Sequence, residues 1–88
     1  MPHTIATVGS AVGLHARPAS IVAEAAAKLD VEVTLKLEGS DEEPVDAASS
    51  LLIMTLGAEQ GARVVVESDD EDAVAKIAAL IESDLDAE

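Results

Sequence analysis

The chain has 88 residues, a formal net charge of −13 from 18 acidic against 5 basic side chains, and no Phe, Tyr, Trp or Cys. This length predicts one domain spanning residues 1–88, while the charge argues against nucleic acid or an anionic lipid surface as a partner. The absence of cysteine excludes disulfides and thiolate metal sites, and no apolar stretch is long enough for membrane insertion.

Three segments in the first half of the chain have a clear periodicity. Residues 3–8, HTIATV, alternate in part and predict a strand at the edge of a sheet. Residues 16–29 place apolar side chains at helical spacing, and Pro18 suits the first turn of that helix, where no backbone N–H is needed. Residues 31–37, VEVTLKL, alternate without error and predict a half-buried strand.

The second half begins with a turn, EGSDEEP, followed by PVDA, which is long enough only for a short third strand. Residues 47–56, AASSLLIMTL, predict a short helix with Ile53 and Leu56 in the core, although the run LLIM could also form a buried strand. RVVVE, residues 63–67, predicts the fourth strand. A final helix begins at the acids of residues 69–72 and has an apolar stripe that reaches Leu85.

The resulting order is βαββαβα. No connection is long enough to build a fully parallel sheet, so the predicted fold class is α+β. We expect an open-faced β-sandwich, in which a four-stranded antiparallel sheet carries three helices on one face.

The stretch GLHARPAS places His15 and Arg17 at the start of the first helix. A helix N-terminus presents unpaired N–H groups and partial positive charge, which attract an anion. The same field and Arg17 oppose protonation of the imidazole, so we predict a neutral, nucleophilic ring near neutral pH. A phosphoryl group attached to His15 would be stabilised by the helix end and by Arg17.

GLHARPAS before an alanine-rich helix, and VDAASSLLIMTLGAEQG before a valine strand, resemble the HPr family of histidine phosphocarriers of the sugar phosphotransferase system. The resemblance covers essentially the whole chain and implies that His15 carries the phosphoryl group beside Arg17, with Gly13 forming the preceding turn. It implies enzyme I, charged by phosphoenolpyruvate, as the donor and an enzyme II A domain as the acceptor. It also implies a monomeric cytoplasmic carrier without cofactor or metal, and not an enzyme acting alone.

The resemblance further implies a surface where partners dock, which would be formed by Ala16, Ser20, Ser50, Leu51, Leu52 and Met54. Ser49 falls at the position of a regulatory serine in the family, but we favour a helix-capping role for it, since Ala48 replaces the lysine common before that serine. Lysines common around the docking surface of relatives are replaced by Glu24, Ala27, Ala48 and Leu52. Docking is therefore expected to rely on apolar contacts.

The alternatives to a phosphocarrier are an acyl carrier protein and a small regulatory or ligand-binding module. An acyl carrier protein is also small and acidic, but its fold is all helical, which the alternating strand patterns contradict. A small regulatory or ligand-binding module on the same fold, in which His15 is merely polar, stays open; it predicts no phosphoryl transfer.

The 18 acids also lead to the hypothesis that the protein works in concentrated salt. Repulsion between like charges destabilises the compact state, and the screening length falls from about 10 Å at 0.1 M to about 3 Å at 1 M salt. We therefore expect the urea midpoint of unfolding to rise when potassium chloride is increased from 0.1 M to about 2 M. An unchanged or lower midpoint would contradict the hypothesis and leave solubility as the role of the charge.

Overall fold

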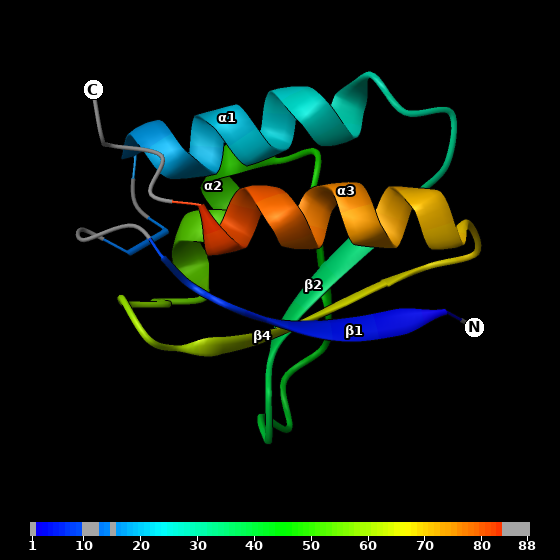
Figure 1. Ribbon diagram of the computed structural model, residues 1–88. Coiled ribbons are helices and arrows are strands. Elements are labelled where there is room, and N and C mark those ends of the chain that lie inside the picture. The colour runs from blue at the N-terminus through cyan, green and yellow to red at the C-terminus, as the bar shows by residue number, and fades with distance from the viewer. Residues whose placement is uncertain (1, 10–12, 15, 84–88) are drawn as a thin grey trace.

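The computed structural model describes residues 2–9, 13–14 and 16–83. In chain order the elements are β1 (His3–Thr7), α1 (Ala16–Ala27), β2 (Val33–Leu37), β3 (Val45–Asp46), α2 (Ser50–Thr55), β4 (Arg63–Ser68) and α3 (Glu71–Glu82). This is the predicted βαββαβα order, and the helices lie on one face of the sheet (Figure 1). Leu85, expected at the end of the last helix, lies outside the described residues.

The four strands form one antiparallel sheet in the order β1-β4-β2-β3. The central strand β4 pairs with β1 through Ile5 and Val65 and with β2 through Leu35 and Val66. β1 is therefore an edge strand, as predicted. Because side chains alternate along each strand, Leu35 and Val66 face the helices while Val65 faces the open side.

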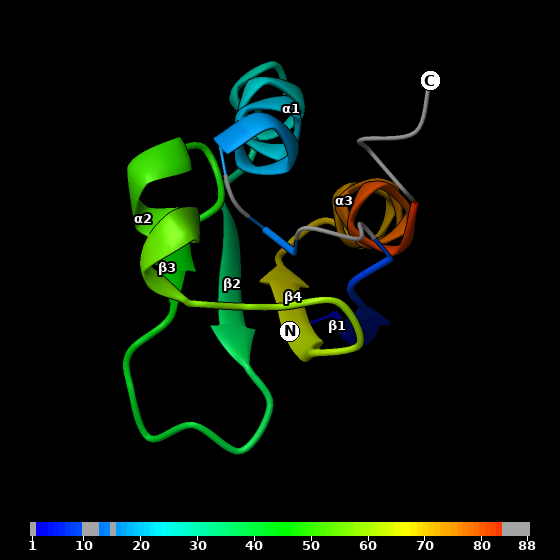
Figure 2. The same cartoon turned by 90° about the vertical axis from the view of Figure 1, so that its left-hand side faces the viewer.

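The core lies between the sheet and the helix layer. α3 covers β1 and β4, α2 lies next to β3, and α1 packs against both other helices (Figure 2). The contacts are aliphatic and come from every layer; the largest side chains that are almost fully buried are Leu14, Leu35, Ile53, Ile77, Ile81, Val8, Val22, Val33, Val64 and Val66. The sheet thus buries one face and leaves the other to solvent, which confirms the open-faced sandwich.

Several element boundaries differ from the prediction by one or two residues: β1 ends at Thr7 and not at residue 8, and backbone hydrogen bonds explain two further differences. The helix expected over residues 16–29 ends at Ala27, because the N–H of Leu29 donates to the carbonyl of Ala26 at 3.1 Å in a tighter turn. The strand expected from residue 31 begins at Val33, where the pairing with Ser68 of β4 begins. β4 in turn extends one residue beyond the prediction.

The segment predicted as a helix over residues 47–56 is helical only from Ser50 to Thr55. The N–H of Ala47 donates to the carbonyl of Val33 at 2.9 Å, so this residue still belongs to the sheet edge. Ile53 is fully buried, whereas Leu56, also expected in the core, is only half-buried. The reading of LLIM as a strand is therefore wrong, and the four-stranded sheet contradicts the all-helical fold of an acyl carrier protein.

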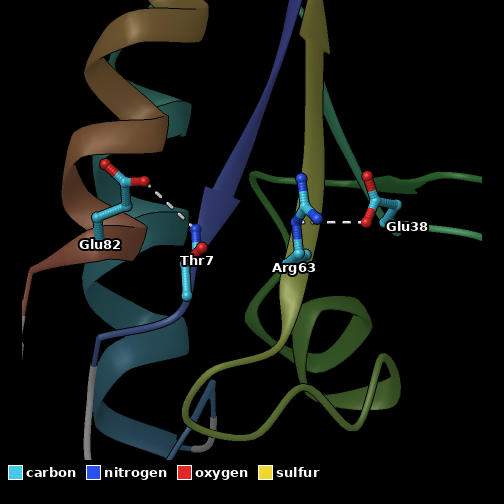
Figure 3. Close-up of polar contacts among 4 residues, drawn as sticks. All are labelled: Thr7, Glu38, Arg63 and Glu82. Atoms are coloured by element: carbon cyan, nitrogen blue, oxygen red, sulfur yellow. Dashed lines mark hydrogen bonds and ion pairs between the residues drawn. The ribbon is translucent and has the colours of Figure 1, made fainter.

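Side-chain contacts tie the end of α3 to the strands. The carboxylate of Glu82 accepts a hydrogen bond from the N–H of Thr7 at 3.3 Å, and Arg63 pairs with Glu38 at 3.3 Å on the open side (Figure 3). The N–H of Gly9 also donates to the carbonyl of Ile81 at 3.0 Å. The Arg63 pair is solvent-exposed and adds little stability, so the backbone contact of Gly9 is the firmer link.

Two leucine-sized side chains of α2 provide a matched test of this packing. Ile53 is 0% exposed and Leu51 is 73% exposed, although they belong to the same short helix. We expect Ile53→Ala to lower the free energy of unfolding by about 2–5 kcal/mol, because it removes buried methyl groups and leaves a cavity. Leu51→Ala should change it by less than about 0.5 kcal/mol. Urea denaturation of both variants measures the difference, and equal losses would contradict the observed orientation of α2.

Candidate functional site

The residues on either side of position 15 are fixed by buried contacts, while His15 itself lies outside the described residues. Leu14 is 1% exposed, and its N–H donates to the carbonyl oxygen of Ala58 at 2.8 Å. On the other side, Pro18 and Ala19 are buried in the first turn of α1. The start of α1 is therefore held in position by side chains that pack in the core.

Gly13 approaches a neighbouring loop so closely that no side chain would fit. Its φ is 74°, in the left-handed region that favours glycine. A methyl group at this position would overlap the carbonyl oxygen of Ala58. Gly13 thus has a backbone conformation that suits a turn, and the absence of a side chain allows the contact between Leu14 and Ala58.

The connection between α2 and β4, residues 57–62, holds both ends of the segment that precedes α1. In addition to the Leu14 contact, Val8 exchanges backbone hydrogen bonds of 2.9 Å with Gly61 and Ala62, and the side-chain amide of Gln60 donates to the carbonyl of Gly9 at 3.4 Å. Sequence analysis did not find this support. Gly57 and Gly61 mark a turn, but no local signal tells which distant segment the turn contacts.

The two long helices have opposite electrostatics at their N-termini. α3 is capped by Asp70 and carries Glu71 and Asp72 in its first turn, an arrangement that neutralises the partial positive charge of the helix end. α1 has no acidic residue in its first turn and instead carries the exposed Arg17. Within the first turn of α1, no acid offsets the positive potential of the helix end, which suits an external anion.

α1 and α2 together form the surface on which docking residues were predicted. Ala16 and Ser20 are exposed on α1; on α2, Leu51 is 73% and Leu52 is 42% exposed. Ser50 is half-buried and lines a groove that Ser20 also lines, which brings two of the predicted residues together. Met54 is half-buried and packs against the core, so it offers only part of its side chain to a partner.

Ser49 occupies the N-cap position of α2. Its backbone is extended, and its hydroxyl oxygen accepts a hydrogen bond from the N–H of Leu52 at 3.3 Å. This is the capping geometry that we favoured for Ser49.

Metal and membrane sites find no support in residues 2–9, 13–14 and 16–83. In that part of the chain no three His, Asp or Glu side chains are grouped so as to hold a metal ion. Its helices are also too short or too polar for any of them to span a bilayer.

Comparison with known proteins gives a consistent result. Residues 3–83 match the family model described as PTS HPr component phosphorylation site. The chain is 51% identical over 71 residues to the phosphocarrier protein HPr of Streptomyces coelicolor, covering 80% of this chain and 73% of that protein. It is 42% identical over 64 residues to HPr of Haloferax volcanii, covering 69% and 70% of the two chains.

Solved structures show the same fold. The crystal structure of HPr-C-His from Thermoanaerobacter tengcongensis superposes with a TM-score of 0.84 at 32% identity, covering 100% of this chain and 99% of that one. HPr from Bacillus anthracis superposes with a TM-score of 0.77 at 27% identity, covering 90% and 94%. The likeness extends over all layers of the sandwich.

Alanine variants of Gly13 and Gly57 test the close contact between Gly13 and Ala58. Gly13 and Gly57 have φ values of 74° and 65°, but only Gly13 has atoms within contact distance of an added methyl group. Alanine at either position costs about 1 kcal/mol for the backbone conformation. We expect Gly13→Ala to lose about 1–3 kcal/mol more, because the Ala58 carbonyl must move. Urea denaturation measures both variants, and equal losses would show that the close approach contributes nothing.

Proposed function

This chain belongs to the HPr family of phosphocarrier proteins, and on that premise we propose that His15 accepts a phosphoryl group from enzyme I and passes it to an enzyme II A domain. Enzyme I is charged by phosphoenolpyruvate, and the relay serves carbohydrate uptake and phosphorylation. The protein is then a carrier that two enzymes act upon. We include in the proposal a monomeric, cytoplasmic protein that folds as one domain over residues 1–88.

The chemistry assigned to His15 needs a neutral ring. A lone pair on an imidazole nitrogen attacks phosphorus, the N–P bond forms, and the bond between phosphorus and the donor breaks with its electron pair retained by the donor. The phosphohistidine carries close to two negative charges. The observation that best supports this assignment is the first turn of α1, which carries the exposed Arg17 and no acidic residue, in contrast to the acids at the start of α3.

The strength of these interactions suits a relay. A charge at a helix end is stabilised by about 0.3–1 kcal/mol when exposed, which is too little to trap the phosphoryl group. Arg17 adds a charge-assisted partner, and it is exposed, so water competes with it. A phosphoryl group that is stabilised this weakly can be transferred to the next protein.

Partner binding is assigned to six residues on α1 and α2, of which Ser50 and Met54 are half-buried and the others exposed: Ala16, Ser20, Ser50, Leu51, Leu52 and Met54. Leu51 and Leu52 are the most exposed large apolar side chains among the described residues, and such side chains contribute most when a partner buries them. Ser49 is assigned only its capping role.

Incubation with enzyme I and labelled phosphoenolpyruvate tests the proposal. We expect acid-labile label on the wild-type protein and none on His15→Ala, while His3→Ala, the matched change at the second histidine, keeps the wild-type rate. Arg17→Ala should keep the fold but slow transfer about 10-fold or more, because one charge-assisted partner of the phosphoryl group is lost. Label on His15→Ala at the wild-type rate would refute the site. A wild-type protein that accepts no label would favour the ligand-binding module.

A further inference from the structure

A groove of about 230 Å³ runs between α1 and the start of α2. It is lined by Ser20, Ala23, Glu24, Ala27, Ala48 and Ser50. This volume is below the roughly 300–1,000 Å³ of sites that hold small molecules, so the groove has room for one side chain of a partner. Its walls are alanine and serine except at Glu24, and such small walls leave space for a long aliphatic stem.

Glu24 is the one charged side chain among the residues that line this groove. Its side chain is exposed and forms no hydrogen bond or ion pair with the described part of the chain, and Lys28, one turn further along, does not reach it. Glu24 is the only acid in α1, and residues 47–58, which include the whole of α2, contain no charged side chain. The other side chains that line the groove are therefore uncharged, and the Glu24 carboxylate has no neighbouring charge among them.

Glu24 lies close enough to the start of α1 to affect the binding of an anion there. Arg17 and Glu24 are seven residues apart, which places them on the same side of α1 about 10 Å apart along its axis. If the phosphoryl group arrives at the Arg17 end, the Glu24 carboxylate lies within about one screening length of it at 0.1 M salt. An unneutralised carboxylate there would oppose the arrival of that anion.

We propose that the docking partner inserts a lysine or arginine side chain into the α1–α2 groove, where Glu24 is its counter-ion. The aliphatic stem of that side chain lies on Ala23, Ala27 and Ala48, and its charge meets the carboxylate. Charge complementarity selects this occupant over an acidic side chain or a second copy of a chain with net charge −13. The inference rests on the proposed function and adds the sign of charge by which the partner is recognised.

Charge variants at Glu24 test the proposal with enzyme I as the probe. We expect Glu24→Gln to raise the KM of enzyme I for the carrier about 3- to 10-fold and Glu24→Lys to raise it at least about 10-fold at 0.1 M salt, with kcat within about 2-fold. The matched control is Glu43→Gln, an equal change in net charge at an exposed residue of the β2–β3 connection, which should leave KM unchanged. Glutamine and lysine favour helices as well as glutamate does, so the circular dichroism spectrum and melting temperature should stay native.

Raising the salt concentration gives a second readout. The difference in KM between the wild-type protein and Glu24→Lys should shrink from 0.1 M to 1 M salt, because the screening length falls from about 10 Å to about 3 Å. A KM for Glu24→Lys equal to or below that of the wild-type protein would overturn the proposal, since the groove would then be empty or filled by an acid. An equal rise for Glu43→Gln would also overturn it, because net charge alone would explain the effect.

Calorimetric binding of the unphosphorylated proteins to enzyme I separates the two proposals. Binding that weakens in Glu24→Gln but not in Glu43→Gln supports the counter-ion even if no label reaches His15, in which case only the proposed function fails. Label on His15 with binding indifferent to Glu24 leaves the proposed function standing and overturns the counter-ion. No binding of the wild-type protein overturns both.

Discussion

The core contains no aromatic side chain, so close packing of alanine, valine, leucine and isoleucine must hold the sheet and the helices together. Each of these side chains buries less apolar surface than an aromatic ring, and stability has to come from many small contacts. Buried alanines, namely Ala19, Ala23 and Ala26 in α1 and Ala73 and Ala78 in α3, let the helices approach closely. Such close layers leave little room for a helix to shift, which fixes the helix ends in space.

The candidate site depends on this fixed helix position. Leu14, Pro18 and Ala19 are buried beneath the start of α1, while Ala16, Arg17 and Ser20 are exposed between and beside them. The residues offered to a partner are thus held by neighbours whose side chains belong to the core. The backbone contacts from residues 57–62 add a second restraint, because they hold the strand end before the site and the turn next to it. If this surface meets two partners in turn, as we propose, such preorganisation favours the binding of both.

Local patterns predicted most of the fold, because they record which face of an element is buried. The alternation in residues 31–37 predicted β2, and the helical stripes predicted α1 and α3. The run LLIM was ambiguous, since tertiary contacts alone decide that Ile53 is buried and Leu51 exposed. The strand order and the contact between Gly13 and Ala58 join residues far apart in the sequence, which periodicity does not encode. The motif around position 15 indicated the family and the site residues, but not the groove between α1 and α2.

The distribution of acids bears on how a chain of charge −13 could carry a phosphoryl group. Half of its 18 acidic side chains lie in two stretches, residues 38–46 and 69–72. The first begins in the β2–β3 connection, which extends away from the helices, and ends in β3; the second begins α3 beside the end of α1, at Lys28 and Asp30 (Figures 1 and 2). Arg17 lies ten residues before the end of α1 at Ala27, which is about 15 Å along the helix axis and beyond the screening length of about 10 Å at 0.1 M salt.

The electrostatic free energy of placing an anion at the start of α1 therefore depends on the nearby charges more than on the net charge of the chain. Among the described residues, Glu59 lies beside the turn at Gly13, and its Cα is one of the atoms that a methyl group at Gly13 would meet. Glu82, near the preceding strand end, has its carboxylate engaged by the N–H of Thr7. Arg17 and the positive N-terminal end of α1, whose first turn holds no acid, oppose these negative charges. Because added salt weakens the distant acids more than it weakens these short-range contacts, the balance at the helix start becomes more favourable to an anion as ionic strength rises.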